Sequence, residues 1–278
     1  MAILLAGLSA IMYGAGDFCG GMATRRTALP AVLVVSQGVG LAIAVAAAVL
    51  LGMRVVSATD LLWGVVAGVC GTAGIAALYA ALASTVVAVA SPLAAVTGAV
   101  LPVLLGVASG ERPGALGWAG IALGIAAIVL LTRTPSGSGS PLLVRRAAML
   151  GSAAGIGFGL FFFAISRTSH ESGIWPLVAA RGATISLVLL YAVLRRAPLR
   201  VSRAGLPMVL SSGALDMGAN IAFLLASRLG MLSISAVVAA LYPAPTVILA
   251  WIILKERMNA PRVAGLVLAV AGVALLSS

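Results

Sequence analysis

Long apolar runs alternate with short polar connectors along the whole chain. Each run holds about 20 residues, the length that a helix needs to cross the hydrocarbon core of a bilayer. Hydrophobic residues make up 62% of the 278 positions and charged residues only 8%, whereas a soluble domain carries roughly a quarter charged residues. We therefore predict an all-α integral membrane protein with ten transmembrane helices and no separate soluble domain.

The runs form two sets of five, bounded by charges, prolines and Gly/Ser clusters. The first set predicts spans at 2–23, 31–52, 61–82, 86–108 and 115–131. The second set predicts spans at 147–165, 174–194, 206–225, 233–254 and 263–276. Residues 133–146 between the sets are rich in Pro, Gly and Ser, which is typical of a flexible linker. The predicted units are therefore 1–132 and 147–278, joined by this linker.

A shift of 145 residues aligns the second set with the first, which indicates an internal repeat. The shift superposes Glu111 and Glu256, Arg112 and Arg257, Gly120 and Gly265, and Tyr13-Gly14 and Phe158-Gly159. Because five is an odd number of spans, a second copy joined by a short linker enters the membrane from the opposite face. We therefore expect two inverted five-helix repeats around a shared site near the membrane midplane.

Glycine and proline positions add detail to this architecture. Glycines spaced four residues apart predict close helix packing, at Gly64/Gly68, Gly120/Gly124 and Gly151/Gly155/Gly159. Prolines predict matching breaks in the fourth and ninth spans, at Pro92 with Pro102 and at Pro243 with Pro245. Such breaks either line a cavity or only kink the helix, and both interpretations stay open.

The end of the second set carries the motifs of a known family. Leu241-Tyr242-Pro243 is followed by an apolar helix, then by Lys255-Glu256-Arg257, Gly265 and Ala271-Gly272-Val273, and Gly110-Glu111-Arg112 repeats part of this order. The sequence thus resembles the drug/metabolite transporter superfamily, specifically its EamA-type members with two five-helix repeats. The resemblance implies a secondary transporter, commonly an exporter of metabolites, amino acids or toxic cations that is often coupled to protons. Thr97-Gly98 stands where the second half has Tyr242-Pro243, so the site is not expected to be symmetric.

Three ionisable residues lie well inside predicted spans, namely Asp17, Arg181 and Asp216. A charge at such depth costs roughly 2.5 to 3.5 kcal/mol on insertion scales, so it usually faces a partner or a polar cavity. We predict that Asp216 is a proton-coupling or cation-binding carboxylate, with a static salt bridge to Arg181 as the alternative. Asp17 either acts in transport or reaches to the interface, and Arg181 pairs with a protein carboxylate or with a substrate anion.

Other polar and aromatic residues at similar depth are candidates to line the substrate cavity. They are Gln37, which lies next to the place that matches Arg181 in the second span, and Tyr79, Asn220, Tyr242 and Trp251. Tyrosine and tryptophan also anchor helix ends at the headgroups, so the aromatic candidates keep this alternative.

The leading functional prediction is a secondary active transporter that exports a small polar or cationic metabolite, such as an amino acid or drug, by proton-coupled alternating access. The alternative is a passive facilitator or channel, or a lipid-handling membrane protein, without proton coupling. An enzyme is not expected, because no Ser/His or paired-carboxylate constellation is present and His170 falls in a connector. Cys19 and Cys70 are predicted to be small core residues. We therefore expect no catalytic residue, no metal site and no cofactor.

The net charge of +11 comes from Lys and Arg residues in connectors, which act as topology signals and give no nucleic-acid surface. Connectors that follow odd-numbered spans carry twelve of these residues and those on the other face carry four. This bias places both termini outside the cytoplasm, whereas the family usually has them inside. The expected partners are the lipid bilayer, a small-molecule substrate and protons. We expect a monomer in the bacterial cytoplasmic (inner) membrane.

Overall fold

A computed structural model describes residues 1–54, 57–82, 87–133 and 140–277, and every regular element in these ranges is an α-helix. The helices are α1 (Ala2–Thr24), α2 (Leu29–Leu50), α3 (Ala58–Leu82), α4 (Val87–Ala108), α5 (Ala115–Thr132), α6 (Pro141–Ser166), α7 (Trp175–Arg195), α8 (Leu206–Leu229), α9 (Leu232–Ala239), α10 (Pro243–Leu254) and α11 (Ala260–Ser277). In the described ranges, ten segments are long and apolar enough to cross a membrane, with α9 and α10 forming one of them. The predicted all-α, ten-span fold is confirmed, and the chain is a multi-pass integral membrane protein.

Helix α6 begins earlier than the sequence suggested. Its N-terminus at Pro141 lies inside the predicted linker, 133–146. Ser140 caps the helix by accepting a hydrogen bond from the backbone N–H of Leu143 at 3.4 Å, and proline suits the first helical position because it has no N–H to lose. Residues 134–139 of the predicted linker lie outside the described residues.

The ninth span is broken between α9 and α10 at residues 240–242, directly before Pro243. Two prolines two residues apart remove two backbone donors from one turn, which a continuous helix cannot replace. The hydroxyl of Thr246 donates to the backbone oxygens of Tyr242 and of Gly14 on α1, both at 3.0 Å. The break is therefore held against α1, as Gly14 allows the close approach.

The prediction of a matching break in the fourth span was wrong. Helix α4 continues from Val87 to Ala108 through both Pro92 and Pro102. These prolines stand ten residues apart, so each one interrupts a different turn and the turns between them keep their hydrogen bonds.

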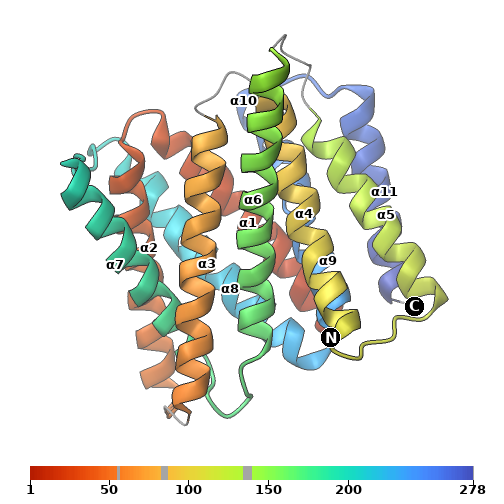
Figure 1. The fold of residues 1–278 in the computed structure, drawn as a ribbon, viewed down its shortest axis with the longest axis horizontal. Helices are drawn as coiled ribbons and strands as arrows, with labels where there is room; N and C mark the ends of the chain where they lie inside the picture. The colour runs from red at the N-terminus through yellow and green to blue at the C-terminus, as the bar shows by residue number, and fades with distance from the viewer. Residues whose placement is uncertain (55–56, 83–86, 134–139, 278) are drawn as a thin grey trace.

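The helices pair in a pattern that is preserved when each span is exchanged for the span five places away. Helix α1 packs along α8 as α6 packs along α3, while α2 packs on α7 and α5 packs on α11. Figure 1 shows both chain ends at one end of the bundle and the start of α6 at the other. The end with the termini is called the terminal end below, and the opposite end is called the linker end.

Small residues bring these helices into backbone contact. A Cβ at Gly64 or Gly68 would overlap backbone carbonyls of α7, and a Cβ at Gly151 or Gly155 would overlap carbonyls of α4. In lipid, helices associate through such close approaches because burial of apolar surface adds little. The packing role predicted from the glycine spacing is confirmed at these positions.

Candidate functional site

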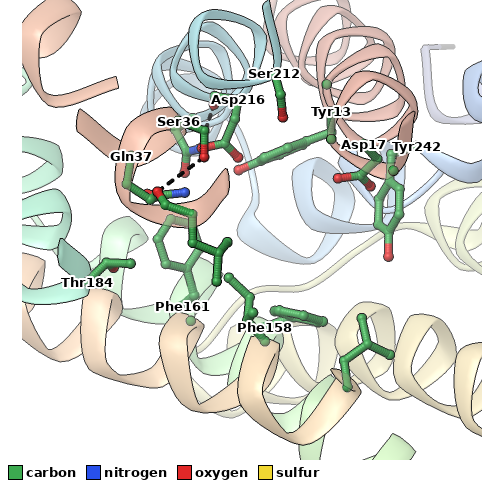
Figure 2. Close-up of a pocket in the computed structure, with 18 of the residues that line it drawn as sticks. Tyr13, Asp17, Ser36, Gln37, Phe158, Phe161, Thr184, Ser212, Asp216 and Tyr242 are labelled. Carbon is green, nitrogen blue, oxygen red and sulfur yellow. Dashed lines mark hydrogen bonds between the residues drawn. The ribbon is translucent and has the colours of Figure 1, made fainter. Parts of the chain in front are cut away.

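A cavity of about 280 Å³ lies between the helices (Figure 2), near the lower end of the sizes typical of small-molecule sites. Helix α1 lines it only from Tyr13 onward, and α2 lines it only as far as Gln37. Lining residues continue to Thr24 and Leu29, on either side of the α1–α2 connector. The cavity therefore extends from mid-depth towards the linker end, while the halves of α1 and α2 nearer the terminal end pack without lining it.

Arg181 on α7 is the charged centre of the cavity wall. It is 7% exposed, and its guanidinium donates to Gln37 Oε1 on α2 and to Asp216 Oδ2 on α8, the latter at 2.5 Å. Gly40 leaves room for it, because a Cβ there would lie 3.3 Å from Arg181 Nε. Three helices thus meet at one guanidinium. The salt bridge that was the alternative for Asp216 is present in the structure.

Asn220 lies one turn after Asp216 on α8 and faces the same cavity. Its side-chain nitrogen donates to the backbone oxygen of Asp216 at 2.6 Å, while its Oδ1 has no hydrogen-bond partner among the described residues. A buried acceptor left unpaired costs about 1 to 3 kcal/mol. Since Asn220 is only 2% exposed, this oxygen is an acceptor that a ligand or a water molecule in the cavity would satisfy.

Asp17 on α1 brings a second carboxylate to the cavity. Within the described part of the chain it makes no hydrogen bond or ion pair, and the guanidinium that lines the cavity is bound by Asp216 and Gln37. Figure 2 shows Asp17 between the rings of Tyr13 and Tyr242. Arg181 and Asp216 compensate each other, so Asp17 is left as a carboxyl group without a countercharge among the described residues.

Aromatic rings lie on both sides of this carboxylate and across the cavity from it (Figure 2). The ring of Tyr13 meets the ring of Phe162 edge-on with centroids 6.1 Å apart, and it meets the ring of Tyr242 with centroids 6.4 Å apart. Phe158 and Phe161 on α6 complete the wall. A carboxylate among aromatic faces offers both Coulombic and cation–π attraction to an organic cation.

Equivalent positions of the two halves line the cavity together. The 145-residue shift relates Tyr13 to Phe158, Gly16 to Phe161, Asp17 to Phe162, Ser36 to Arg181, Gly71 to Asp216, and Ile75 to Asn220, and all of these residues line the cavity. In each pair that has a charged member, the other member is neutral. The cavity is thus shared by both halves, while its charges are placed asymmetrically.

Most of the predicted site residues come together here. The cavity is lined by Asp17, Gln37, Arg181, Asp216, Asn220 and Tyr242. Trp251 is not among the lining residues, and it is 52% exposed on α10. The side chain of Tyr79 lies outside the described residues.

The aromatic wall was missed by the sequence analysis. Phenylalanine is as suitable for contact with lipid as for a cavity, so composition alone gives no signal. The alignment of Tyr13 with Phe158 in the repeat was the one available indication, since both residues line the cavity.

Residues 145–278 match the model of the EamA-like transporter family. The second half of this chain belongs to that family. Together with the ten apolar spans, the match confirms the resemblance to EamA-type members of the drug/metabolite transporter superfamily. The family match and the spans fit a membrane transporter of that superfamily.

Comparison of the whole chain with other proteins gives information on the fold. No curated protein matches the sequence. One solved structure, described only as the crystal structure of a protein, covers 99% of this chain with a TM-score of 0.82 and 20% identity, and the match spans 95% of that chain. At this identity the similarity shows a shared fold and does not identify a substrate.

Proposed function

We propose that this protein is a secondary active transporter that exports a small organic cation, or a polar metabolite with a cationic group, by proton-coupled alternating access. The observation that carries the proposal is the environment of Asp17. Its carboxylate has no cationic partner among the described residues and lies among aromatic rings in a cavity at mid-depth. Carboxylates at such depth usually mark a substrate or proton pathway.

The cavity supplies distinct contacts for a substrate of this kind. Asp17 attracts the cationic group, while the rings of Tyr13 and Phe158 contact its apolar part. The free acceptor of Asn220 takes a hydrogen bond from a polar substituent. Arg181 remains bound to Asp216, so this pair fixes the wall and does not bind the substrate.

Proton coupling follows from competition at one carboxylate. Asp17 holds either a proton or the cationic substrate, since both neutralise the same charge. Release of the substrate on one side of the membrane is therefore exchanged for uptake of a proton there. We therefore assign proton coupling to Asp17. Asp216, the residue that the sequence favoured for this role, is already neutralised by Arg181.

Alternating access follows from two inverted repeats. Three features support this relation: α1 and α6 start at opposite ends of the bundle (Figure 1), the helix pairs are preserved on exchange of the halves, and equivalent positions line the cavity. Rocking of one half against the other then closes the linker end and opens the terminal end.

The charge bias favours one orientation of the protein in the membrane. The cavity extends towards the linker end, which carries the connectors with twelve of the basic residues. Basic connectors stay in the cytoplasm, so this state takes up substrate from the cytoplasm and both termini lie outside it. In the bacterial inner membrane such a state begins an export cycle.

Transport by reconstituted vesicles tests the proposal. We expect wild-type protein to accumulate benzyltrimethylammonium against its gradient when a proton gradient is imposed, and we expect Asp17→Asn to abolish this uptake. Glu171→Gln, which neutralises an exposed carboxylate in the α6–α7 connector, is the matched control and retains uptake. Cation flux that does not depend on the proton gradient would instead identify a facilitator. Redistribution of labelled lipid without cation flux would identify a lipid-handling protein.

A further inference from the structure

Glu111, in the connector between α4 and α5, caps a helix that lies far from it in the sequence. Its carboxylate accepts hydrogen bonds from the backbone N–H groups of Leu232 at 2.5 Å and Ser233 at 2.9 Å. These are the first two residues of α9, whose own preceding residue, Met231, provides no side-chain cap. The first N–H groups of a helix need acceptors from elsewhere, and a carboxylate also suits the positive end of the helix dipole.

The surroundings of Glu111 fit this contact closely. Gly106 is buried beside the carboxylate, and a Cβ at that position would overlap Glu111 Oε2. The backbone N–H of Glu111 also donates to the Gly106 oxygen at 3.0 Å. The contact lies at the terminal end, where the bundle is closed, and it joins the α4–α5 connector to α9.

The second half repeats the same parts at the linker end. The 145-residue shift takes Glu111 to Glu256 and takes Leu232, where α9 begins, to Val87, the first described residue of α4. The turns before the two glutamates are equivalent as well. Gly110 has φ +102° and Lys255 has φ +58°, although lysine rarely adopts this left-handed conformation.

The repeated parts are not in the same state. Glu256 is exposed and pairs with Arg262 at 3.2 Å, whereas Glu111 is bound to α9. Among the described residues, the cap is therefore formed at the closed end, whereas at the end towards which the cavity extends the Glu256 carboxylate contacts only Arg262.

We propose that Glu111 and Glu256 are alternating helix caps that position the two halves during the transport cycle. Glu111 holds the N-terminus of α9 while the terminal end is closed. When the linker end closes, Glu256 leaves Arg262 and binds the N-terminus of α4, and Glu111 releases α9. The proposal rests on the alternating access proposed above, and it assigns the residues that stabilise each closed end.

Thiol labelling of purified protein in nanodiscs tests the exchange, because both faces of the protein are then accessible. The background is Cys19→Ser/Cys70→Ser. One reporter is Ser212→Cys, which lines the cavity. The other is Ser235→Cys on α9, where the serine is 1% exposed. We expect a bulky maleimide to label position 212 quickly and position 235 slowly.

Removal of each cap is expected to shift the ratio of the two labelling rates in opposite directions. Glu111→Gln increases labelling at 235 relative to 212 about fivefold, the size of an ordinary helix-cap effect. Glu256→Gln shifts the ratio the other way by a similar factor. Arg262→Gln, which breaks the surface ion pair but keeps the Glu256 carboxylate, favours closure of the linker end and therefore shifts the ratio as Glu111→Gln does.

The Glu256 variant separates this proposal from a purely structural role of Glu111. If Glu256 only forms a surface ion pair, Glu256→Gln and Arg262→Gln leave the ratio unchanged or change it in the same direction, and either result overturns the proposal. Gly106→Ala provides a second variant that displaces the Glu111 carboxylate without removing its charge, and it must act as Glu111→Gln does. If the ratios shift as expected while wild-type vesicles transport no cation, the proposed function fails and the alternating caps stand.

Discussion

Asp17 and Phe162 occupy equivalent places in the two halves of the chain, and both line the central cavity. One half thus supplies a carboxylate where the other supplies an aromatic ring. A ligand with a cationic head and an apolar body would therefore bind in one orientation only, with its head towards α1. Both halves line the cavity, and its charged residues lie at positions where the two sequences differ under the 145-residue shift.

Asp17→Asn is expected to remove cation binding and to leave the fold intact. The carboxylate has no described partner to lose, so the midpoint of thermal unfolding does not fall. In the wild type, benzyltrimethylammonium at one hundred times its dissociation constant stabilises the native state by about 2.7 kcal/mol, and this stabilisation disappears in the variant. A variant that unfolds early, or that is still stabilised by the cation, would contradict the assignment of Asp17.

Arg181 and Asp216 are expected to be strongly coupled in stability. Asp216→Leu alone leaves the buried Arg181 without its ion-pair partner and lowers the free energy of unfolding by roughly 3 to 5 kcal/mol. Arg181→Met leaves Asp216 unpaired and lowers it less, because the Asp216 side chain is 30% exposed. The double variant recovers most of this loss, because no charge is left unpaired. Unfolding in mixed detergent measures all four proteins of the cycle, and simple addition of the two single effects would show that the pair is not coupled.

The sequence predicted the spans well because hydropathy determines where a chain can lie in a bilayer. Its weakest predictions concerned local backbone detail, such as the continuity of α4 through Pro92 and Pro102. Whether a proline breaks a helix depends on whether the carbonyls that it leaves unpaired find other donors, which hydropathy does not reveal. The hydroxyl of Thr246, four residues after Tyr242, is such a donor to the Tyr242 carbonyl at the break.

Charged residues of the site could be predicted because a charge inside an apolar run is conspicuous. Asp17, Arg181 and Asp216 all line the cavity. The direction that a side chain faces could not be predicted in the same way, since the helices are apolar on all sides. Trp251 accordingly stood as a candidate although it is half-exposed outside the cavity lining, while Phe158 was overlooked.

Gly155→Ala is expected to weaken the contact between α6 and α4. The added Cβ would lie 2.6 Å from the backbone oxygen of Ala94 and 2.9 Å from the backbone nitrogen of Gly98, so the helices must separate. Overpacking of this kind lowers the free energy of unfolding by about 1 to 3 kcal/mol. Gly7→Ala is the matched control on α1, where a Cβ meets nothing within 4 Å. It is expected to be neutral or slightly stabilising, and equal losses in both variants would refute the packing argument.

Arg228→Gln is expected to weaken closure of the terminal end without affecting the linker end. Arg228, near the end of α8, donates to the backbone oxygen of Ser169 at 2.5 Å and to the hydroxyl of Thr168 at 3.2 Å. Asp60 on α3 holds the same connector by accepting hydrogen bonds from the backbone and hydroxyl of Ser169 and from the hydroxyl of Ser172. Residue Gly205 stands where the repeat would place a second Asp60, so this network has no counterpart at the other end.

Labelling at Ser235→Cys measures this effect. Loss of the hydrogen bonds from a charged donor is worth about 1.5 to 3 kcal/mol, so labelling of position 235 rises by at least about tenfold in Arg228→Gln. The matched control is Arg167→Gln, in the same connector, where the exposed guanidinium lies over the ring of Phe163 at 5.8 Å and does not join the network. Because the network occurs at one end only, no substitution at the linker end reproduces its effect, in contrast to the reciprocal pair Glu111 and Glu256. Equal labelling in the Arg228 and Arg167 variants would mean that the network stabilises the connector alone and not the closed terminal end.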